Sequence, residues 1–167
     1  MLLRPFRDDD DAAATLDVFR RAITVLASRD YTAEQVAAWA SPDIDPAVWA
    51  ERRAASRTQV AEVDGRVVGF TDVDEDGYVD MLFVDPDVAR QGVGSALLRW
   101  ARATAVELGA HALTTNASLT ARPAFEAHGF VVVAEQHPVL RGVELTNFRM
   151  RCALDPDLRR EAGGAAG

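Results

Sequence analysis

The segment from Tyr78 to Leu108 most constrains what this chain can fold into, because it joins two contrasting elements through a short glycine-containing turn. Residues 78–84 read Tyr-Val-Asp-Met-Leu-Phe-Val, a nearly continuous apolar run typical of a central strand buried on both faces. Gly92-x-Gly94 then leads into residues 92–108, whose apolar side chains recur at helical spacing as far as Gly109. The sequence therefore predicts a mixed α/β (α+β) fold.

The rest of the chain supplies further strands and helices. Strands are expected at residues 2–6, 59–63, 66–73, 112–116, 130–140 and 143–152, in addition to 78–84. Asp64-Gly65 is a two-residue turn of the kind that closes a hairpin, so the second and third of these strands should pair. Helices are expected where Leu16, Phe19, Ile23 and Leu26 recur, through Val36 and Trp39, around Trp49, and over residues 121–128.

Composition limits the class of protein and its partners. The 167 residues, 49% hydrophobic and 26% charged, fit one globular domain at 1–154, followed by a disordered tail at 155–167. A net charge of -8 disfavours nucleic acid and anionic membranes and fits a cationic substrate better. With one cysteine and no zinc-site spacing, neither a disulfide nor a metal is expected. No apolar run approaches the ~18 residues of a membrane span, so we expect a cytoplasmic protein, a monomer or a homodimer.

The turn before the long helix is the first candidate binding site. Glycine lets backbone approach a ligand closely, and the unpaired N–H groups at a helix start favour phosphate. Taken alone, Gly92-x-Gly94 fits a pyrophosphate-binding loop and an ordinary tight turn equally well. The chain has neither the Gly-Lys-Ser/Thr nor the Gly-x-Gly-x-x-Gly pattern of the commoner nucleotide loops, which disfavours ATP and NAD as ligands.

The order of these parts resembles the GNAT N-acetyltransferase superfamily, whose acetyl-CoA-binding motif has a Gln/Arg-x-x-Gly-x-Gly/Ala core. Asn116, followed by a helix that closes in Gly129-Phe130, looks like the next motif of that family. Residues 31–40, 118–123 and 141–150 resemble more narrowly its YafP-like branch. The resemblance covers most of the chain and implies a GNAT-like single domain, with a mixed, mostly antiparallel sheet of about seven strands flanked by helices.

The resemblance also implies an activity and a co-substrate. It predicts direct transfer of acetyl from acetyl-CoA to a primary amine of a small molecule or a peptide. The residues it places against acetyl-CoA are Leu82, Phe83, Val84, Ala89, Arg90, Gln91, Gly92, Val93, Gly94, Ser95, Asn116 and Phe125. Two of them depart from the family pattern, because Ala89 stands where the motif begins with Gln or Arg, and Phe125 stands where many members carry a tyrosine as general acid.

Amine acetylation requires a base, because an alkylammonium with a pKa near ~10 is almost fully protonated at pH 7. Asp80, two residues before Leu82 on the predicted central strand, is the first candidate, and the alternative is a solvated residue at the strand start. Glu62 and Glu144 are weaker candidates. A backbone N–H near Leu82 or Phe83 would hold the oxyanion.

The general acid and the acceptor pocket are less sharply indicated. Tyr31 and Tyr78 are the two tyrosines. We favour Tyr31, because the region between the first two helices roofs the acceptor cleft in GNAT folds, although such a tyrosine also plugs helix junctions. Trp39 and Trp49 would line an acceptor pocket or belong to the core. Cys152 reads as a buried apolar residue, and the three histidines lack the spacing of a triad.

Two other functions stay open. The departures at Ala89 and Phe125 favour a CoA- or acyl-CoA-binding module that has lost catalysis. The third interpretation is a structural domain in which Gly92-x-Gly94 is only a turn.

Overall fold

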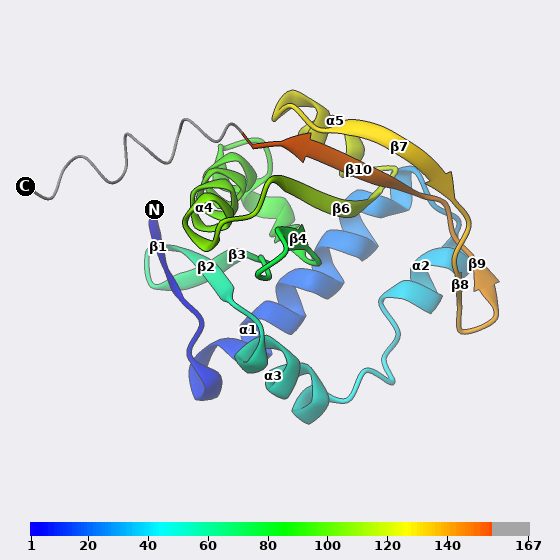
Figure 1. Cartoon of the computed structure of the whole chain (residues 1–167). Helices are drawn as coiled ribbons and strands as arrows, with labels where there is room; N and C mark the ends of the chain where they lie inside the picture. The colour runs from blue at the N-terminus through cyan, green and yellow to red at the C-terminus, as the bar shows by residue number, and fades with distance from the viewer. Residues whose placement is uncertain (155–167) are drawn as a thin grey trace, which may run out of the picture.

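A computed structural model describes residues 1–154, so the predicted tail at 155–167 lies outside the described residues (Figure 1). The strands, in chain order, are β1 (Leu2–Pro5), β2 (Thr58–Val63), β3 (Arg66–Asp72), β4 (Tyr78–Val79), β5 (Leu82–Val84), β6 (Ala112–Ser118), β7 (Val131–Gln136), β8 (Val139–Leu140), β9 (Val143–Glu144) and β10 (Asn147–Ala153). The helices are α1 (Asp8–Arg21), α2 (Ala33–Trp39), α3 (Pro46–Ala55), α4 (Val93–Leu108) and α5 (Arg122–Ala127). The end of α1 continues into a π-helical turn, Ala22–Leu26.

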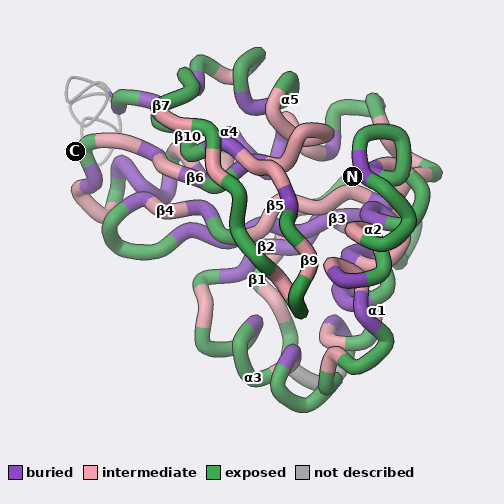
Figure 2. Tube along the Cα trace, turned by 90° about the vertical axis from the view of Figure 1, so that its right-hand side faces the viewer, coloured by how far each residue is buried: buried purple, intermediate pink, exposed green. Residues whose placement is uncertain are grey.

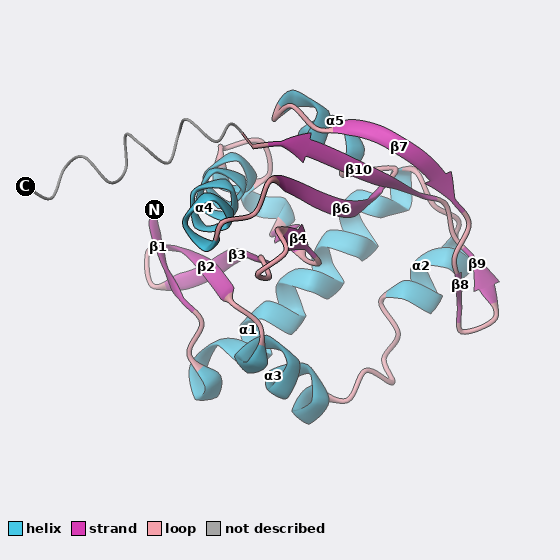
Figure 3. Ribbon diagram, viewed as in Figure 1, coloured by secondary structure: helices cyan, strands magenta, loops and turns pink. Residues whose placement is uncertain are grey.

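The long strands form two four-stranded sheets. One has the order β1-β2-β3-β5 and is antiparallel throughout; the other has the order β4-β6-β10-β7, in which only the β4–β6 pair is parallel. The strands β8 and β9 form a separate hairpin (Figure 3). The mixed, mostly antiparallel α/β architecture predicted from the sequence is confirmed.

Helices cover both faces of the first sheet. Because side chains alternate between faces along a strand, Val60 and Phe70 pack toward α1, whereas Ala61 packs toward α4. Gly69 allows the close approach of α4, since a Cβ there would lie 3.0 Å from Val93 Cγ1. In Figure 2 the buried residues gather where the strands meet the inner sides of these helices. No helix of the described chain combines the length and apolar character needed to cross a bilayer.

The segment 78–84, predicted as one central strand buried on both faces, lies instead at the edges of the two sheets, and residues 82–84 are only half-buried. It is two strands: β4 pairs with β6 of the second sheet, and β5 pairs with β3 of the first. Between them, the N–H groups of Asp80 and Met81 both donate to Oδ1 of Asp72, at 2.9 Å each. A side chain of β3 thus takes the place of a strand partner, and the two sheets part at this point.

The two C-terminal strands are also shorter than expected. The predicted strand at 130–140 is β7 followed by β8, and the predicted strand at 143–152 is β9 followed by β10. The described chain therefore contains ten strands, several of them only two residues long, where about seven were expected. The hairpin of β8 and β9 packs against α2 at the edge of the opening between the sheets.

Candidate active site

Two cavities lie along the opening between β5 and the end of β6. The larger has a volume of about 660 Å³, and the smaller has a volume of about 340 Å³. We call them the large cavity and the small cavity. Residues that line both are Trp39, Leu82, Phe83, Ser118 and Ala121. The two cavities therefore meet at β5, where the sheets have parted.

The small cavity collects most of the residues that the resemblance assigns to acetyl-CoA. Its lining includes Leu82, Phe83, Val84, Ala89, Arg90, Gly92, Gly94 and Ser95. The other four predicted residues do not line it. Val93, the first residue of α4, is buried against β2 and β3, and the side-chain amide of Gln91 donates to the carbonyl of Asp87. Asn116 and Phe125 line the large cavity instead.

The start of α4 is open to the small cavity. Gly92 precedes the helix with a left-handed φ of 86°, and no described side chain caps the helix end. The N–H of Ala96 donates to the carbonyl of Gly92, so the N–H groups of Val93, Gly94 and Ser95 have no helical acceptor. Such N–H groups, together with the positive end of the helix dipole, suit a phosphate group.

An ion-pair cluster fixes the loop that leads to α4. Asp85 is buried, and it receives hydrogen bonds from Nε of Arg21 at 3.1 Å and from the N–H of Asp87 at 2.9 Å. Arg21 also contacts the carboxylate of Asp87 at 2.9 Å. This cluster ties α1 to the loop and leaves Arg90, with its positive φ of 65°, at the cavity.

The backbone of β5 presents free groups to the opening. Asp72 N–H donates to the carbonyl of Met81, and Asp85 N–H donates to the carbonyl of Val68. Hydrogen-bonded pairs alternate along an antiparallel ladder, so the N–H groups of Leu82 and Val84 point away from β3. β5 is the edge strand of its described sheet, and those groups therefore face the junction of the two cavities.

Asp80 lies in the wall of the large cavity, where the sheets part. Its side chain is 51% exposed, and Oδ2 is 3.7 Å from Nη2 of the buried Arg53. The hydroxyl of Tyr78 is 3.5 Å from Oδ1 of Asp80 and accepts a hydrogen bond from Nδ2 of Asn116 at 3.2 Å. Burial, with a smaller contribution from the charge of Asp80, raises the pKa of Tyr78.

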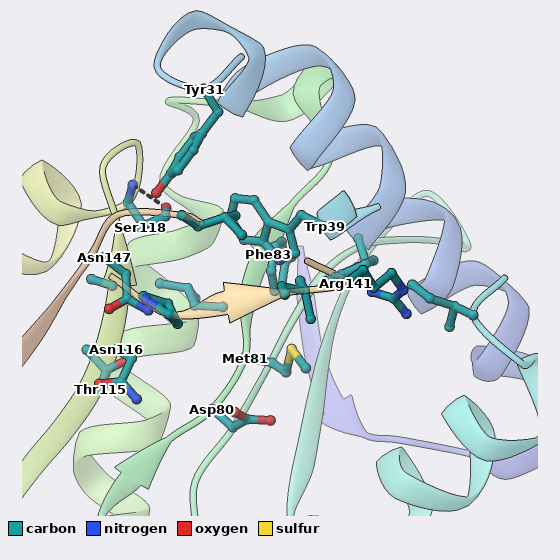
Figure 4. A pocket seen from close by; sticks show the side chains of 18 of the residues that line it. Tyr31, Trp39, Asp80, Met81, Phe83, Thr115, Asn116, Ser118, Arg141 and Asn147 are labelled. Atoms are coloured by element: carbon teal, nitrogen blue, oxygen red, sulfur yellow. Dashed lines mark hydrogen bonds between the residues drawn. The ribbon is translucent and has the colours of Figure 1, made fainter. Parts of the chain in front are cut away.

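Tyr31 lies at the other end of the same cavity wall, separated from Asp80 by Phe83 and Met81 (Figure 4). Its hydroxyl donates to the carbonyl of Thr146 at 2.5 Å and accepts the N–H of Leu119 at 2.9 Å. Burial raises its pKa. The hydroxyl proton that a general acid would give up is therefore already donated to Thr146. Through its two hydrogen bonds, the Tyr31 hydroxyl joins the helical segment to the residue after β6 and the residue before β10.

The polar group of Tyr78, Asp80 and Asn116 was only partly predicted. Asn116 was expected at the end of its strand, on the cofactor side, but β6 continues to Ser118 and Asn116 faces the large cavity. Asn116 lies near Tyr78 because β4 pairs with β6 in parallel, with Tyr78 opposite Thr114. The sequence does not show which strands pair, so it could not predict this neighbourhood.

Phe125 combines two roles. Its side chain is 2% exposed and packs edge-on against Phe130, with ring centroids 5.0 Å apart, yet it also contributes to the wall of the large cavity. Trp39 and Trp49 likewise line the cavity and belong to an aromatic cluster with Phe19 and Phe83. Both tryptophans therefore belong to the core or pack against it, as one alternative predicted. That the cavity they line receives the acceptor stays a prediction.

The weaker candidates lie elsewhere. Glu62 pairs with Arg4 at 2.8 Å, and Glu144 lies on β9 near His137; neither lines either cavity. Cys152 is buried in the core beneath α4 and α5. Within residues 1–154, no cluster of three or more His, Cys, Asp or Glu side chains is arranged to share a metal ion.

Comparisons with known proteins agree with this geometry. A family profile described as "Acetyltransferase (GNAT) domain" matches residues 27–152. The protein named "Uncharacterized N-acetyltransferase YafP" of Escherichia coli K12 is 44% identical over 134 residues, which cover 80% of this chain and 84% of that protein.

Solved structures give the same result. A GCN5-related N-acetyltransferase from Rhodopseudomonas palustris is 35% identical, with 92% of this chain and 95% of that chain covered and a TM-score of 0.88. The PaiA N-acetyltransferase from Thermoplasma acidophilum, solved in complex with coenzyme A, is 15% identical with 91% and 98% covered and a TM-score of 0.73, which shows a shared fold. The profile match and the identity to YafP establish that the chain belongs to the GNAT N-acetyltransferase family, whose members are acyltransferases.

Proposed function

We propose that this protein transfers acetyl from acetyl-CoA directly to a primary amine carried on an apolar body. The observation that carries the proposal is the meeting of two cavities at the free N–H of Leu82, one beside an uncapped helix start and the other beside a carboxylate. The structure of PaiA with coenzyme A supports the choice of co-substrate.

Acetyl-CoA would occupy the small cavity. The N–H groups of Val93, Gly94 and Ser95 would bind its pyrophosphate, with Arg90 as the cationic side chain of the loop. The pantetheine arm would pair with the free edge of β5, which runs from the helix start to the junction of the cavities. Ala89 contributes no hydrogen bond from its side chain, so the backbone supplies most of the contacts.

The amine would enter through the large cavity. Asp80 would take its proton, the freed nitrogen would attack the thioester carbon, and a C–N bond would replace the C–S bond. The N–H of Leu82 would stabilise the tetrahedral oxyanion, a role in which a preorganised donor is worth several kcal/mol, about 3 in measured cases. The thiolate of CoA, with a pKa near ~8.5 like other thiols, leaves without a dedicated acid and takes its proton from water.

The lining of the large cavity favours an acceptor with an aromatic or branched apolar body. Its walls include apolar side chains from several elements: Phe19, Trp39, Ile44, Val48, Trp49, Phe83, Val139, Leu140 and Leu145. Three carboxylates, those of Asp43, Asp45 and Asp80, line the same space, with Arg52 and Arg141 as the cations. An ammonium group at the end of an apolar body matches this pattern, whether the acceptor is a small molecule or a peptide.

The test is release of CoA thiol from acetyl-CoA across a panel of amines, run beside calorimetry with CoA. We expect turnover with arylalkyl or branched alkyl amines and little with small polar ones. CoA binding without turnover on any amine would favour the alternative, a binding module without catalysis, for which Ala89 and Phe125 are the supporting departures. Absence of CoA binding would contradict both.

The remaining expectations become proposals of the same kind. A chain ending at residue 154 should retain the full acetyltransferase activity of the 167-residue chain, which a truncation and a thiol-release assay would check. Cell fractionation should find the protein in the cytoplasm, and light scattering should give the mass of a monomer or a homodimer.

A further inference from the structure

A buried ion pair lies directly behind the point where the two sheets part. Nη1 of Arg53, on α3, donates to Oδ2 of Asp72, on β3, at 2.6 Å, and the two side chains are only 4% and 5% exposed. Replacing such a pair by apolar residues is often neutral or stabilising, because desolvation offsets much of the attraction. The contribution of this ion pair to fold stability therefore does not by itself explain why Arg53 and Asp72 are buried here.

Both members of the pair reach Asp80. Oδ1 of Asp72 accepts the N–H of Asp80 and of Met81 at 2.9 Å each, which fixes the backbone of Asp80. Nη2 of Arg53 lies 3.7 Å from Oδ2 of Asp80, which places a cation beside its carboxylate. The guanidinium is itself held over the ring of Trp49, 5.4 Å from the centroid, so it has little freedom to move.

The contact between Arg53 and Asp80 suits a base. At 3.7 Å it is an ion pair longer than a hydrogen bond, so it restrains the carboxylate and leaves Oδ2 able to accept a proton, while Oδ1 faces the hydroxyl of Tyr78. The titratable or charged groups that face Asp80 are Arg53 from α3, Asp72 from β3 and Tyr78 from β4; β6 presents the neutral Asn116. A carboxylate that is 51% exposed would otherwise sample several rotamers in the cavity.

We propose that Arg53, locked in place by Asp72, is a positioning residue that holds the carboxylate of Asp80 toward the amine in the large cavity. The proposal rests on the proposed function, in which Asp80 is the base. In Figure 4 the carboxylate of Asp80 projects from the cavity wall below Met81, at the position this contact would maintain. Alignment of this kind matters because small misplacements of a reacting group slow catalysis by factors of about 10².

The first test is a double-mutant cycle in turnover number at saturating amine. Arg53→Met should lower kcat about tenfold and leave the Kd for CoA within about twofold of the parent value. In an Asp80→Asn background, the same substitution should lower kcat less than about twofold, because Arg53 acts through Asp80. Arg53→Lys should recover part of the rate. Arg57→Met is the matched control, since Arg57 is exposed, follows the same helix and lines neither cavity.

Arg53→Met leaves Asp72 buried without its partner, so a second variant guards against loss of the fold. Arg53→Met with Asp72→Asn removes both charges and keeps an oxygen for the N–H groups of Asp80 and Met81. The kinetic cycle is run on this pair as well. Equal losses of kcat in the parent background and in the Asp80→Asn background would overturn the proposal.

Crystal structures of the parent and of the Arg53→Met, Asp72→Asn chain test the same point without turnover. We expect the carboxylate of Asp80 to leave its parent position in the variant; an unchanged carboxylate would overturn the positioning role. If Asp80→Asn alone left kcat unchanged, the assignment of the base would fail, and the two crystal structures would still decide whether Arg53 positions Asp80.

Discussion

A glutamate in place of Gly94 is the sharpest test of the proposed pyrophosphate site. Gly94 lies in the first turn of α4 and lines the small cavity. A Cβ at this position would meet only Cγ2 of Val84, at 3.6 Å, which is ordinary van der Waals contact. The substitution therefore leaves the fold intact, whereas at Gly92 the φ of 86° would add backbone strain.

The magnitude follows from the new charge. A carboxylate about 5 Å from one pyrophosphate charge costs about 3 kcal/mol at an effective dielectric constant of about 20 and about 0.8 kcal/mol in bulk water. Gly94 is half-buried, so the cost lies between these limits. We expect the Kd for CoA to rise more than about tenfold, which is about 1.4 kcal/mol or more.

Calorimetry with CoA measures the effect, and Gly94→Gln is the matched control because glutamine has the size of glutamate without its charge. The glutamine chain should lose less affinity than the glutamate chain, and the gap should narrow as salt is raised from low to high ionic strength. A glutamate chain with the melting temperature and the CoA affinity of the parent would refute the site. Equal losses in the two variants would refute the electrostatic part of the argument.

Three further predictions address the loop, the base and the buried tyrosine. Arg90→Ala should weaken CoA binding less than about tenfold, and only at low salt, as calorimetry would show; unchanged affinity at low salt would mean that the loop binds through its backbone alone. Asp80→Asn should leave CoA binding intact and lower turnover about 10²-fold at neutral pH, with part of the rate returning at high pH as free amine becomes available; a loss that is equal at every pH would indicate an orienting role. Tyr31→Phe should slow transfer about tenfold or less and destabilise the fold by about 1–3 kcal/mol, because the N–H of Leu119 and the carbonyl of Thr146 lose their buried partner. Since burial raises the pKa of Tyr31, its contribution is fully present below its ordinary pKa of about 10 and is lost as the pH rises through the higher folded value. Above about pH 10 the melting temperature should therefore fall further in the parent than in Tyr31→Phe.

Local patterns predicted the local parts of this structure. The Asp64-Gly65 turn has positive φ at both residues, 51° and 78°, as a two-residue hairpin of this type requires. The helix predicted through Val36 and Trp39 is also confirmed as α2, and Thr32 and Gln35 form a capping box at its start. Each of these features is formed by interactions among a few neighbouring residues, so a short stretch of sequence is enough to predict it.

The opening between the sheets depends on a residue outside the segment that breaks. Residues 78–84 have nearly the composition of one buried strand, and the single charged residue Asp80 is the only mark of a break. The break arises because Asp72, eight residues before Asp80 and on another strand, accepts the N–H groups of Asp80 and Met81. One hydrogen-bonded carboxylate thereby directs β4 to one sheet and β5 to the other, turns the N–H of Leu82 toward the junction of the cavities, and sets Asp80 in the wall of the large cavity.

The same dependence explains why the sequence favoured Tyr31 as general acid, although Phe83 and Met81 separate it from the proposed base. The resemblance to GNAT folds favoured Tyr31, because the region between the first two helices roofs the acceptor cleft in that family. The parallel pairing of β4 with β6 instead brings Tyr78 beside Asn116 and Asp80, while the hydroxyl of Tyr31 is engaged by two backbone groups. A tyrosine that already donates to Thr146 can protonate a thiolate only by giving up that bond, which costs about 1 kcal/mol or more. The proximity of Tyr78 to Asp80 therefore makes it the tyrosine whose removal should disturb the base, and the two hydrogen bonds of Tyr31 make its removal a matter of stability first.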